Sequence, residues 1–271
     1  MPTFQRGDVS LHYELDGSGP PAVYICGMGS HSNDFLSMMI RQALSPHYTL
    51  LTVDNRGAGQ TTTSGKTTLA DMAEDIVAVM HHHQMDAVAV LGISMGGMIG
   101  LTLAVNHPEK VRRQVIAVSC AYAISEPNRS GFILRKIRDM RDQSVPLEAI
   151  NIFNAYLVLG ESVFSDYPEL VEAFVNAPPD PLQMGREGFE LQMGALEGYD
   201  VREQLKQCSI PTLVMSSPED LLIPPRFQDE IAACIPNATI KRYPGGHVFM
   251  MLPAYAAQFF KDVLSFWNSI V

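Results

Sequence analysis

The chain has few cysteines and little positive charge, and these shortages argue against several classes of protein. Its four cysteines lie far apart and form no Cys-x-x-Cys pair, so the sequence predicts neither a zinc ribbon nor a thioredoxin-type redox site. Lysine and arginine together number 19 against 29 aspartates and glutamates, which gives a formal net charge of -10. Because nucleic acids and anionic membranes attract clustered positive charge, we expect neither as a partner.

Long apolar runs are missing as well. No run approaches the roughly 20 residues that span a bilayer, and the polar N-terminal segment has no apolar centre of the kind that a secretory signal needs. Scattered thiols fit a reducing compartment. The sequence therefore predicts a cytoplasmic protein, and it leaves the oligomeric state open.

Short apolar runs alternate with helical patterns over the first 120 residues. Residues 9–16 alternate like one strand of a hairpin, and the runs that follow are apolar throughout, as in strands buried on both faces. The predicted buried strands are 22–26, 48–54, 87–93 and 111–119, and the helices between them are 34–44, 68–80 and 97–105. Because parallel neighbours need a crossover helix, this alternation predicts an α/β fold with a mostly parallel, doubly wound sheet.

The alternation stops near residue 120 and resumes near residue 207. Residues 121–206 have helical spacing interrupted by prolines, without a convincing strand. The later pattern is a strand at 211–216, a helix at about 225–234, a strand at 239–244 and a helix from about 254 to 269. The sequence thus predicts one α/β core, made of residues 1–120 and 207–271, with a helical insertion at 121–206.

The most informative motif is Gly92-Ile93-Ser94-Met95-Gly96, a G-x-S-x-G sequence that directly follows an apolar strand and precedes an apolar helix. On such a turn the glycines let strand and helix approach without Cβ clashes, and the serine projects beside the N-terminus of the helix. This setting predicts that Ser94 is a nucleophile. An ordinary strand–helix turn is the alternative.

A serine hydroxyl needs an adjacent base, and His247 has the most suitable setting among the histidines. It follows the last predicted strand in the loop Tyr-Pro-Gly-Gly-His, which can present the imidazole at the edge of the sheet that carries Ser94. The histidines at 81–83 end a predicted helix, where a solvated face is more typical than a metal site. We expect neither a metal nor a cofactor.

The base in turn needs an acid that fixes its tautomer. We assign this role to Asp220, because it follows strand 211–216 and open α/β sheets build their sites at the carboxyl ends of strands. Glu219 is the competing residue at this position. Glu126, beyond strand 111–119, is the next candidate if neither serves.

Two backbone N–H groups should stabilise the oxyanion of a tetrahedral intermediate. Met95, the residue after the nucleophile, supplies one of them, and we assign the other to Met28 in the loop after strand 22–26. Methionine and phenylalanine near these motifs suggest an apolar pocket. The residues that we expect to line it are Gly27, His31, Tyr156, Met184 and Phe249.

These residues resemble the α/β-hydrolase superfamily across essentially the whole chain. Four blocks match in order, namely CGMG for the oxyanion loop, DNRGAGQT for the turn after the next strand, GISMGG for the elbow, and SSPEDLLIP with PGGH for acid and base. The order Ser…Asp…His is that of the superfamily. The resemblance implies that the helical insertion is a cap domain. The chain is similar to small-molecule hydrolases such as the 3-oxoadipate enol-lactonase group and the aminoacrylate or carbamate hydrolases.

Two features refine the resemblance. The oxyanion loop of the superfamily usually opens with His-Gly, and here Cys26 replaces the histidine. We interpret Cys26 as a small buried filler, with a reactive thiol as the alternative. A serine at the elbow argues against relatives that use aspartate there, the haloalkane dehalogenases and epoxide hydrolases.

The sequence therefore predicts a serine hydrolase that cleaves an ester, lactone or related acyl bond of a small, largely apolar molecule through an acyl-enzyme. Acyl transfer or C–C bond hydrolysis on the same residues is one alternative. A non-catalytic ligand receptor on the same fold is an alternative of another class, because a fold does not dictate function.

Overall fold

The computed structural model of the chain describes residues 2–62, 65–123 and 129–269. Eight strands form one sheet in the order β1-β2-β4-β3-β5-β6-β7-β8. The pairs β1–β2 and β2–β4 are antiparallel and every later pair is parallel, which confirms the predicted mostly parallel α/β sheet. The strands are β1 (Thr3–Arg6), β2 (Val9–Asp16), β3 (Pro21–Ile25), β4 (Thr49–Val53), β5 (Val88–Ile93), β6 (Val111–Ala117), β7 (Thr212–Ser216) and β8 (Ala238–Arg242).

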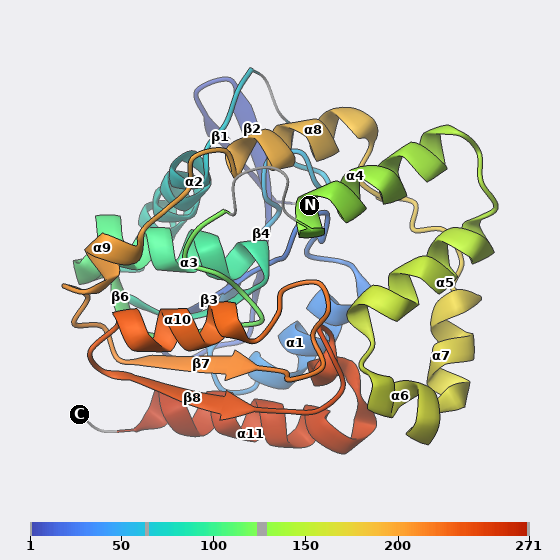
Figure 1. Cartoon of the computed structure of the whole chain (residues 1–271). Coiled ribbons are helices and arrows are strands. Elements are labelled where there is room, and N and C mark those ends of the chain that lie inside the picture. Colours follow the sequence, from blue (N-terminus) through green and yellow to red (C-terminus); the bar gives the residue numbers. More distant parts are fainter. Residues whose placement is uncertain (1, 63–64, 124–128, 270–271) are drawn as a thin grey trace.

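Helices cover both faces of this sheet (Figure 1). One apolar cluster joins the sheet to α2, α3 and α10, and a second joins its other face to α1 and α11. Every residue of β5 is buried, as expected of a parallel strand covered on both sides. The bounds are α1 (Phe35–Leu44), α2 (Leu69–His82), α3 (Met95–Asn106), α10 (Arg226–Cys234) and α11 (Pro253–Asn268), with 3₁₀ turns η1 (Pro108–Lys110) and η2 (Phe249–Met251).

Three details of this core differ from the sequence-based prediction. β1 was not predicted, and it is a half-exposed edge strand with little apolar signal. Helix α3 begins at Met95 rather than at residue 97, because the glycines after Ser94 form its first turn. Strand β6 ends at Ala117, since Val118 has a φ of 44°, which takes it out of the extended region.

The described part of the chain between β6 and β7 carries six helices and no strand of the sheet. Helices α4–α7 lie beyond the ends toward which β7 and β8 point (Figure 1), and their apolar residues form two small clusters. By contrast, Ala195, Val201 and Leu205 belong to the large core cluster. The bounds are α4 (Arg129–Asp142), α5 (Leu147–Val158), α6 (Glu161–Asp166), α7 (Pro168–Val175), α8 (Arg186–Ala195) and α9 (Arg202–Leu205).

This run of helices, called the helical segment below, agrees with the predicted helical insertion in type. The boundaries at residues 120 and 206 stay a prediction. Across the described ranges, no helix combines the length and the apolar character that crossing a membrane requires.

Candidate active site

Ser94 occupies a strained turn between β5 and α3. Its φ of 57° and ψ of -123° are unusual for a residue with a side chain, and such conformations gather at functional sites. The glycines around it are required by close approach. A Cβ on Gly92 would lie 2.5 Å from the carbonyl oxygen of Gly96, and a Cβ on Gly96 would lie 2.1 Å from that of Ile25. Only glycine therefore lets α3 start this close to β3 and β5.

Neighbouring groups hold the strained turn in place. The backbone N–H of Ser94 donates to the carbonyl of Ala117 at 3.0 Å. Its own carbonyl accepts from the Ser119 hydroxyl at 2.7 Å and from the Gly97 N–H at 2.9 Å. These bonds leave the Ser94 side chain to line a cavity above the carboxyl edge of the sheet.

His247 follows β8 and lines the same cavity. Its Nδ1 lies 2.7 Å from Oδ2 of Asp220, and both side chains are almost fully buried. Because an ionised carboxylate only accepts hydrogen bonds, this contact places the ring proton on Nδ1 and leaves Nε2 as an acceptor. Among the described residues, no hydrogen bond joins the imidazole to the Ser94 hydroxyl, a contact that in enzymes often tightens only when substrate binds.

The Asp220 carboxylate is held from its other side as well. Its Oδ1 accepts from the backbone N–H groups of Leu222 and Ile223, at 2.9 Å and 2.8 Å. The turn after β7 thus fixes this side chain against His247.

Glu219, the competing acid, points to the helical segment instead. Its Oε2 accepts from the Ser162 hydroxyl at 2.7 Å and from the Ser162 N–H at 2.9 Å. Ser162 lies in the first turn of α6, where a negative charge is stabilised by the unpaired N–H groups. The arrangement therefore favours Asp220 over Glu219 as the partner of the base. Glu126 lies outside the described residues.

The loop after β3 carries Met28, which lines the cavity together with Met95. Met95 is the first residue of α3, so its N–H has no acceptor within the helix. The next N–H of the loop, that of Gly29, donates to Oε1 of Gln192 at 2.9 Å. Gln192 is fully buried on α8 and donates in turn to the carbonyl of Arg56 at 2.9 Å. The helical segment therefore helps to position this loop.

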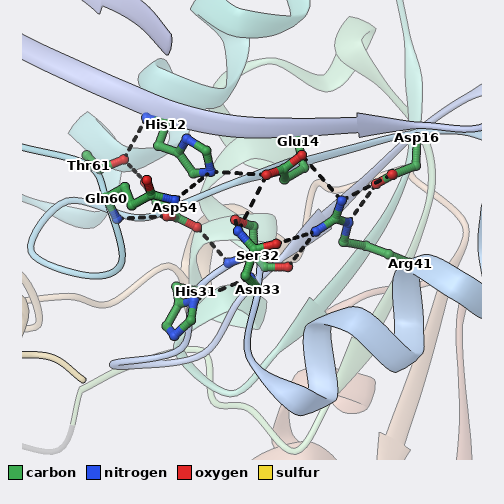
Figure 2. A network of polar contacts seen from close by, with 10 residues as sticks. All are labelled: His12, Glu14, Asp16, His31, Ser32, Asn33, Arg41, Asp54, Gln60 and Thr61. Atoms are coloured by element: carbon green, nitrogen blue, oxygen red, sulfur yellow. Dashed lines mark hydrogen bonds and ion pairs between the residues drawn. The ribbon is translucent and has the colours of Figure 1, made fainter. Parts of the chain in front are cut away.

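A buried polar network supports the later part of the same loop (Figure 2). The Asp54 carboxylate, just after β4, accepts from the backbone N–H groups of Ser32 and Gln60, at 2.6 Å and 2.9 Å. Arg41 of α1 donates to the Ser32 carbonyl and to the Asn33 side chain, both at 2.9 Å. The glycine-rich turn at 54–61 is recognisable in the sequence, but this role is not, because the partners are separated along the chain.

His31 does not line the cavity, so the prediction that placed it in the pocket is corrected. Its side chain is 2% exposed, and its Nε2 lies 2.8 Å from Oδ2 of Asp180. Burial raises the pKa of Asp180, but the hydrogen bonds from His31 and from the Leu182 N–H outweigh it, and the pKa lies below its ordinary value. His31 thus links the loop after β3 to the helical segment rather than to a ligand.

The cavity has a volume of about 850 Å³ and a mostly apolar wall. Of the residues expected in the pocket, Gly27 and Met184 line this cavity, whereas Phe249 and Tyr156 do not; a substrate role for Gly27 and Met184 stays a prediction. Phe249 is fully buried in the apolar cluster that joins the sheet to α1 and α11, where its ring stacks on Tyr243 with 4.5 Å between centroids. Tyr156 is 60% exposed on α5. Apolar residue type alone did not reveal which way these side chains point.

Two cysteines, Cys26 and Cys120, lie close to the site. Cys26 is fully buried, with its Sγ 3.5 Å from the Ser37 hydroxyl, and burial raises the pKa of its thiol well above the ordinary value. Cys120 lines the cavity, and burial raises its pKa to about 12. Since the thiolate is the reactive form, these values favour the interpretation of Cys26 as a filler.

Over residues 2–62, 65–123 and 129–269, no three His, Cys, Asp or Glu side chains gather as ligands for a metal ion. The expectation of a reaction without metal or cofactor stays a prediction.

Comparison with known proteins identifies the family. The alpha/beta hydrolase fold family matches residues 20–254, so the chain belongs to it, and the resemblance noted in the sequence is confirmed. The "putative carbamate hydrolase RutD" of Azorhizobium caulinodans is 27% identical over 257 residues, which cover 92% of each chain. The "3-oxoadipate enol-lactonase 2" of Acinetobacter baylyi is 30% identical over 223 residues, covering 80% of this chain and 79% of its own.

A solved structure gives the same result for the fold. The enol-lactonase of Burkholderia xenovorans LB400 superposes with a TM-score of 0.82, covering 99% of this chain and 100% of its own. At 21% identity this likeness establishes the fold alone. The family and the names of its relatives together support a hydrolase.

Proposed function

We propose that the chain is a serine hydrolase in which Ser94 is the nucleophile, His247 the base and Asp220 the acid that orients the base. The proposal depends on the observed arrangement of these three side chains. Ser94, on its strained turn, lines the same cavity as His247, whose Nδ1 is 2.7 Å from the buried carboxylate of Asp220. This combination supplies a hydroxyl at the cavity wall, a base and a group that stabilises the protonated base.

The proposed reaction passes through an acyl-enzyme. Nε2 of His247 takes the proton of the Ser94 hydroxyl as its oxygen attacks the substrate carbonyl, and the N–H groups of Met28 and Met95 donate to the oxyanion. The leaving alcohol departs with the proton from His247. The same imidazole then activates a water molecule, which releases the carboxylic acid and regenerates the Ser94 hydroxyl.

We further propose that the helical segment serves as a cap over this site. Its α4 and α8 contribute to the wall of the cavity, and the wall is mostly apolar. A small acyl compound with an apolar body fits such a space. Carbamates and enol lactones, named for two relatives, contain acyl bonds of the proposed kind.

The test is a panel of p-nitrophenyl esters and lactones assayed with wild type and Ser94→Ala. We expect the substitution to lower kcat by about 10⁶-fold while the fold is retained, as in other serine triads. Ser165→Ala, which removes an exposed hydroxyl on α6, is the matched control. More than a few per cent activity in pure Ser94→Ala would remove Ser94 from its role.

Labelling separates the alternatives. An active-site fluorophosphonate should modify wild type at Ser94 and leave Ser94→Ala unlabelled. No labelling and no turnover on the panel would favour a non-catalytic ligand receptor. Product analysis with a competing alcohol would show acyl transfer, and a β-diketone substrate would show C–C bond hydrolysis.

A further inference from the structure

Helix α4 presents one face to the cavity. The residues of this face recur at helical spacing and include three arginines; they are Gly131, Leu134, Arg135, Ile137, Arg138 and Arg141. From Gly131 to Arg141 the helix advances ten residues, which is about 15 Å along its axis. The last turn of this face therefore brings positive charge to an otherwise mostly apolar wall.

Two of the three arginines have carboxylate partners within the protein. Arg135 lies 2.9 Å from Glu190, and Arg138 lies 2.6 Å from Asp142. Asp142 also pairs with Arg186, so its charge is already shared between two guanidinium groups.

Arg141 is different. Within the described residues its guanidinium makes no hydrogen bond and no ion pair, and its Nε is buried without a partner, like the Nε of Arg138. Burial lowers the pKa of Arg141, and the charge of Arg138 lowers it further, with no carboxylate opposing them. Arg141 is half-buried, and it lines the cavity without a carboxylate partner among the described residues. Since a charge that is partly withdrawn from water is normally paired, this guanidinium suits an anion that the ligand brings.

The acidic side chains of the cavity do not supply this anion. Asp34 caps α1 by accepting from the Ser37 N–H at 2.7 Å, and Asp180 is paired with His31. Glu197 is exposed to solvent, and its charge is not among the influences on Arg141. The cavity wall therefore carries one positive guanidinium charge that no nearby carboxylate in the described part of the chain neutralises.

We propose that Arg141, with Arg138 beside it, binds a carboxylate of the substrate other than the one that hydrolysis releases. One unpaired guanidinium matches one negative charge, and its planar fork can donate hydrogen bonds to both oxygens of a carboxylate. A phosphate monoester carries nearly two charges and fits this balance less well. The inference rests on the proposed function, and it narrows the substrate to a small acyl compound with an anionic end.

The experiment compares two esters with the same scissile bond. One is the p-nitrophenyl monoester of adipic acid, and the other is its neutral isostere, in which an isopropyl group replaces the free carboxylate. We expect wild type to prefer the anionic ester in kcat/KM. Arg141→Gln should lower kcat/KM for the anionic ester by about tenfold to a hundredfold, the range of a charged hydrogen bond, and change it less than about threefold for the neutral ester.

The rate of hydrolysis of the neutral ester also shows whether the variant is folded, because a misfolded sample would lose activity on both esters. Arg141→Lys, which keeps the charge but loses the fork, should lie between wild type and Arg141→Gln on the anionic ester. Lys136→Gln is the matched control, because it removes a positive charge from α4 outside the cavity wall. Equal loss on both esters, or equal rates for both esters in wild type, would overturn the carboxylate site while leaving the proposed hydrolase in place.

A binding measurement separates this inference from the proposed reaction. Calorimetric titration of adipate into Ser94→Ala should give a dissociation constant about tenfold or more tighter than for the double variant Ser94→Ala, Arg141→Gln. That difference would support the site even if neither ester were hydrolysed. Equal affinities in the two proteins would contradict it.

Discussion

The sheet with its covering helices and the helical segment are built differently. Strands such as β5 are buried throughout, and two large apolar clusters join them to helices on both faces. In the helical segment the apolar clusters are small, and large apolar side chains such as Phe132, Ile152 and Phe164 are exposed. The proposed catalytic residues come from the sheet, whereas the residues that would select a substrate come from the segment. Rigid packing therefore supports the chemistry, and a more loosely packed layer forms the wall around it.

Three polar contacts nevertheless couple the two regions. Gln192 bonds to the Gly29 N–H, Asp180 pairs with His31, and Glu219 caps the start of α6. Two of these contacts end on the loop after β3, which carries the proposed oxyanion donor, and the third ends beside Asp220. The helical segment thus contributes to the position of the loops that bear the site.

We expect the largest difference in kcat between substitutions of two neighbouring carboxylates, one beside the proposed base and the other in contact with the helical segment. Asp220→Asn removes the charge that stabilises the imidazolium and can hold the ring in the wrong tautomer, so we expect kcat to fall by about 10⁴-fold. Glu219→Gln should change kcat less than about threefold, because its contacts are to α6. Both variants are assayed side by side on the best ester of the panel.

The reverse outcome would be equally informative. If Glu219→Gln had the strongly reduced kcat and Asp220→Asn had a kcat near that of wild type, the assignment of the acid would be wrong. If both were near wild type, the acid would lie elsewhere in the chain, and Glu126 would be the next residue to substitute.

A smaller effect is expected where the helical segment supports the loop after β3. Gln192→Leu leaves the Gly29 N–H and the Arg56 carbonyl without partners, which should lower the free energy of unfolding by about 2–4 kcal/mol. It should also lower kcat/KM about tenfold or more, because Met28 precedes Gly29 and small displacements of donors are costly. Urea unfolding and ester hydrolysis measure the two effects.

The control for this prediction is another glutamine of the same segment. Gln204→Leu, on the exposed side of α9, should change stability by less than about 0.5 kcal/mol and leave kcat/KM unaltered. Indistinguishable results for the two variants would show that the helical segment does not position the loop.

The smallest effect is expected at the cysteines near the site. With a pKa of about 12, Cys120 is about 10⁻⁴ thiolate at pH 8, and burial raises the pKa of Cys26 as well. Iodoacetamide at pH 8 should therefore leave both thiols unmodified in the native protein and label them after denaturation, with kcat/KM unchanged. Mass spectrometry of native and unfolded samples checks this. Rapid labelling of native Cys120 would contradict the raised pKa of this thiol.

The sequence by itself determined the type and order of most elements. Buried parallel strands are apolar throughout and their crossover helices carry a 3.6-residue period, so local patterns revealed both. The elbow at Ser94 was recognisable for a similar reason, because strand, glycines and helix follow one another directly in the chain. Asp220 and His247 each follow a predicted strand, which placed both at the carboxyl edge of a parallel sheet.

Only the tertiary structure decided where individual side chains point. Phe249 and Tyr156 are of residue types that are typical of pockets, yet Phe249 is buried in the apolar core and Tyr156 faces solvent. His31 pairs with Asp180, which is about 150 residues away in the chain. Arg141 has no such partner among the described residues, although acidic residues are plentiful. Pairing and burial depend on contacts between distant segments, and a single sequence carries no local signal for them.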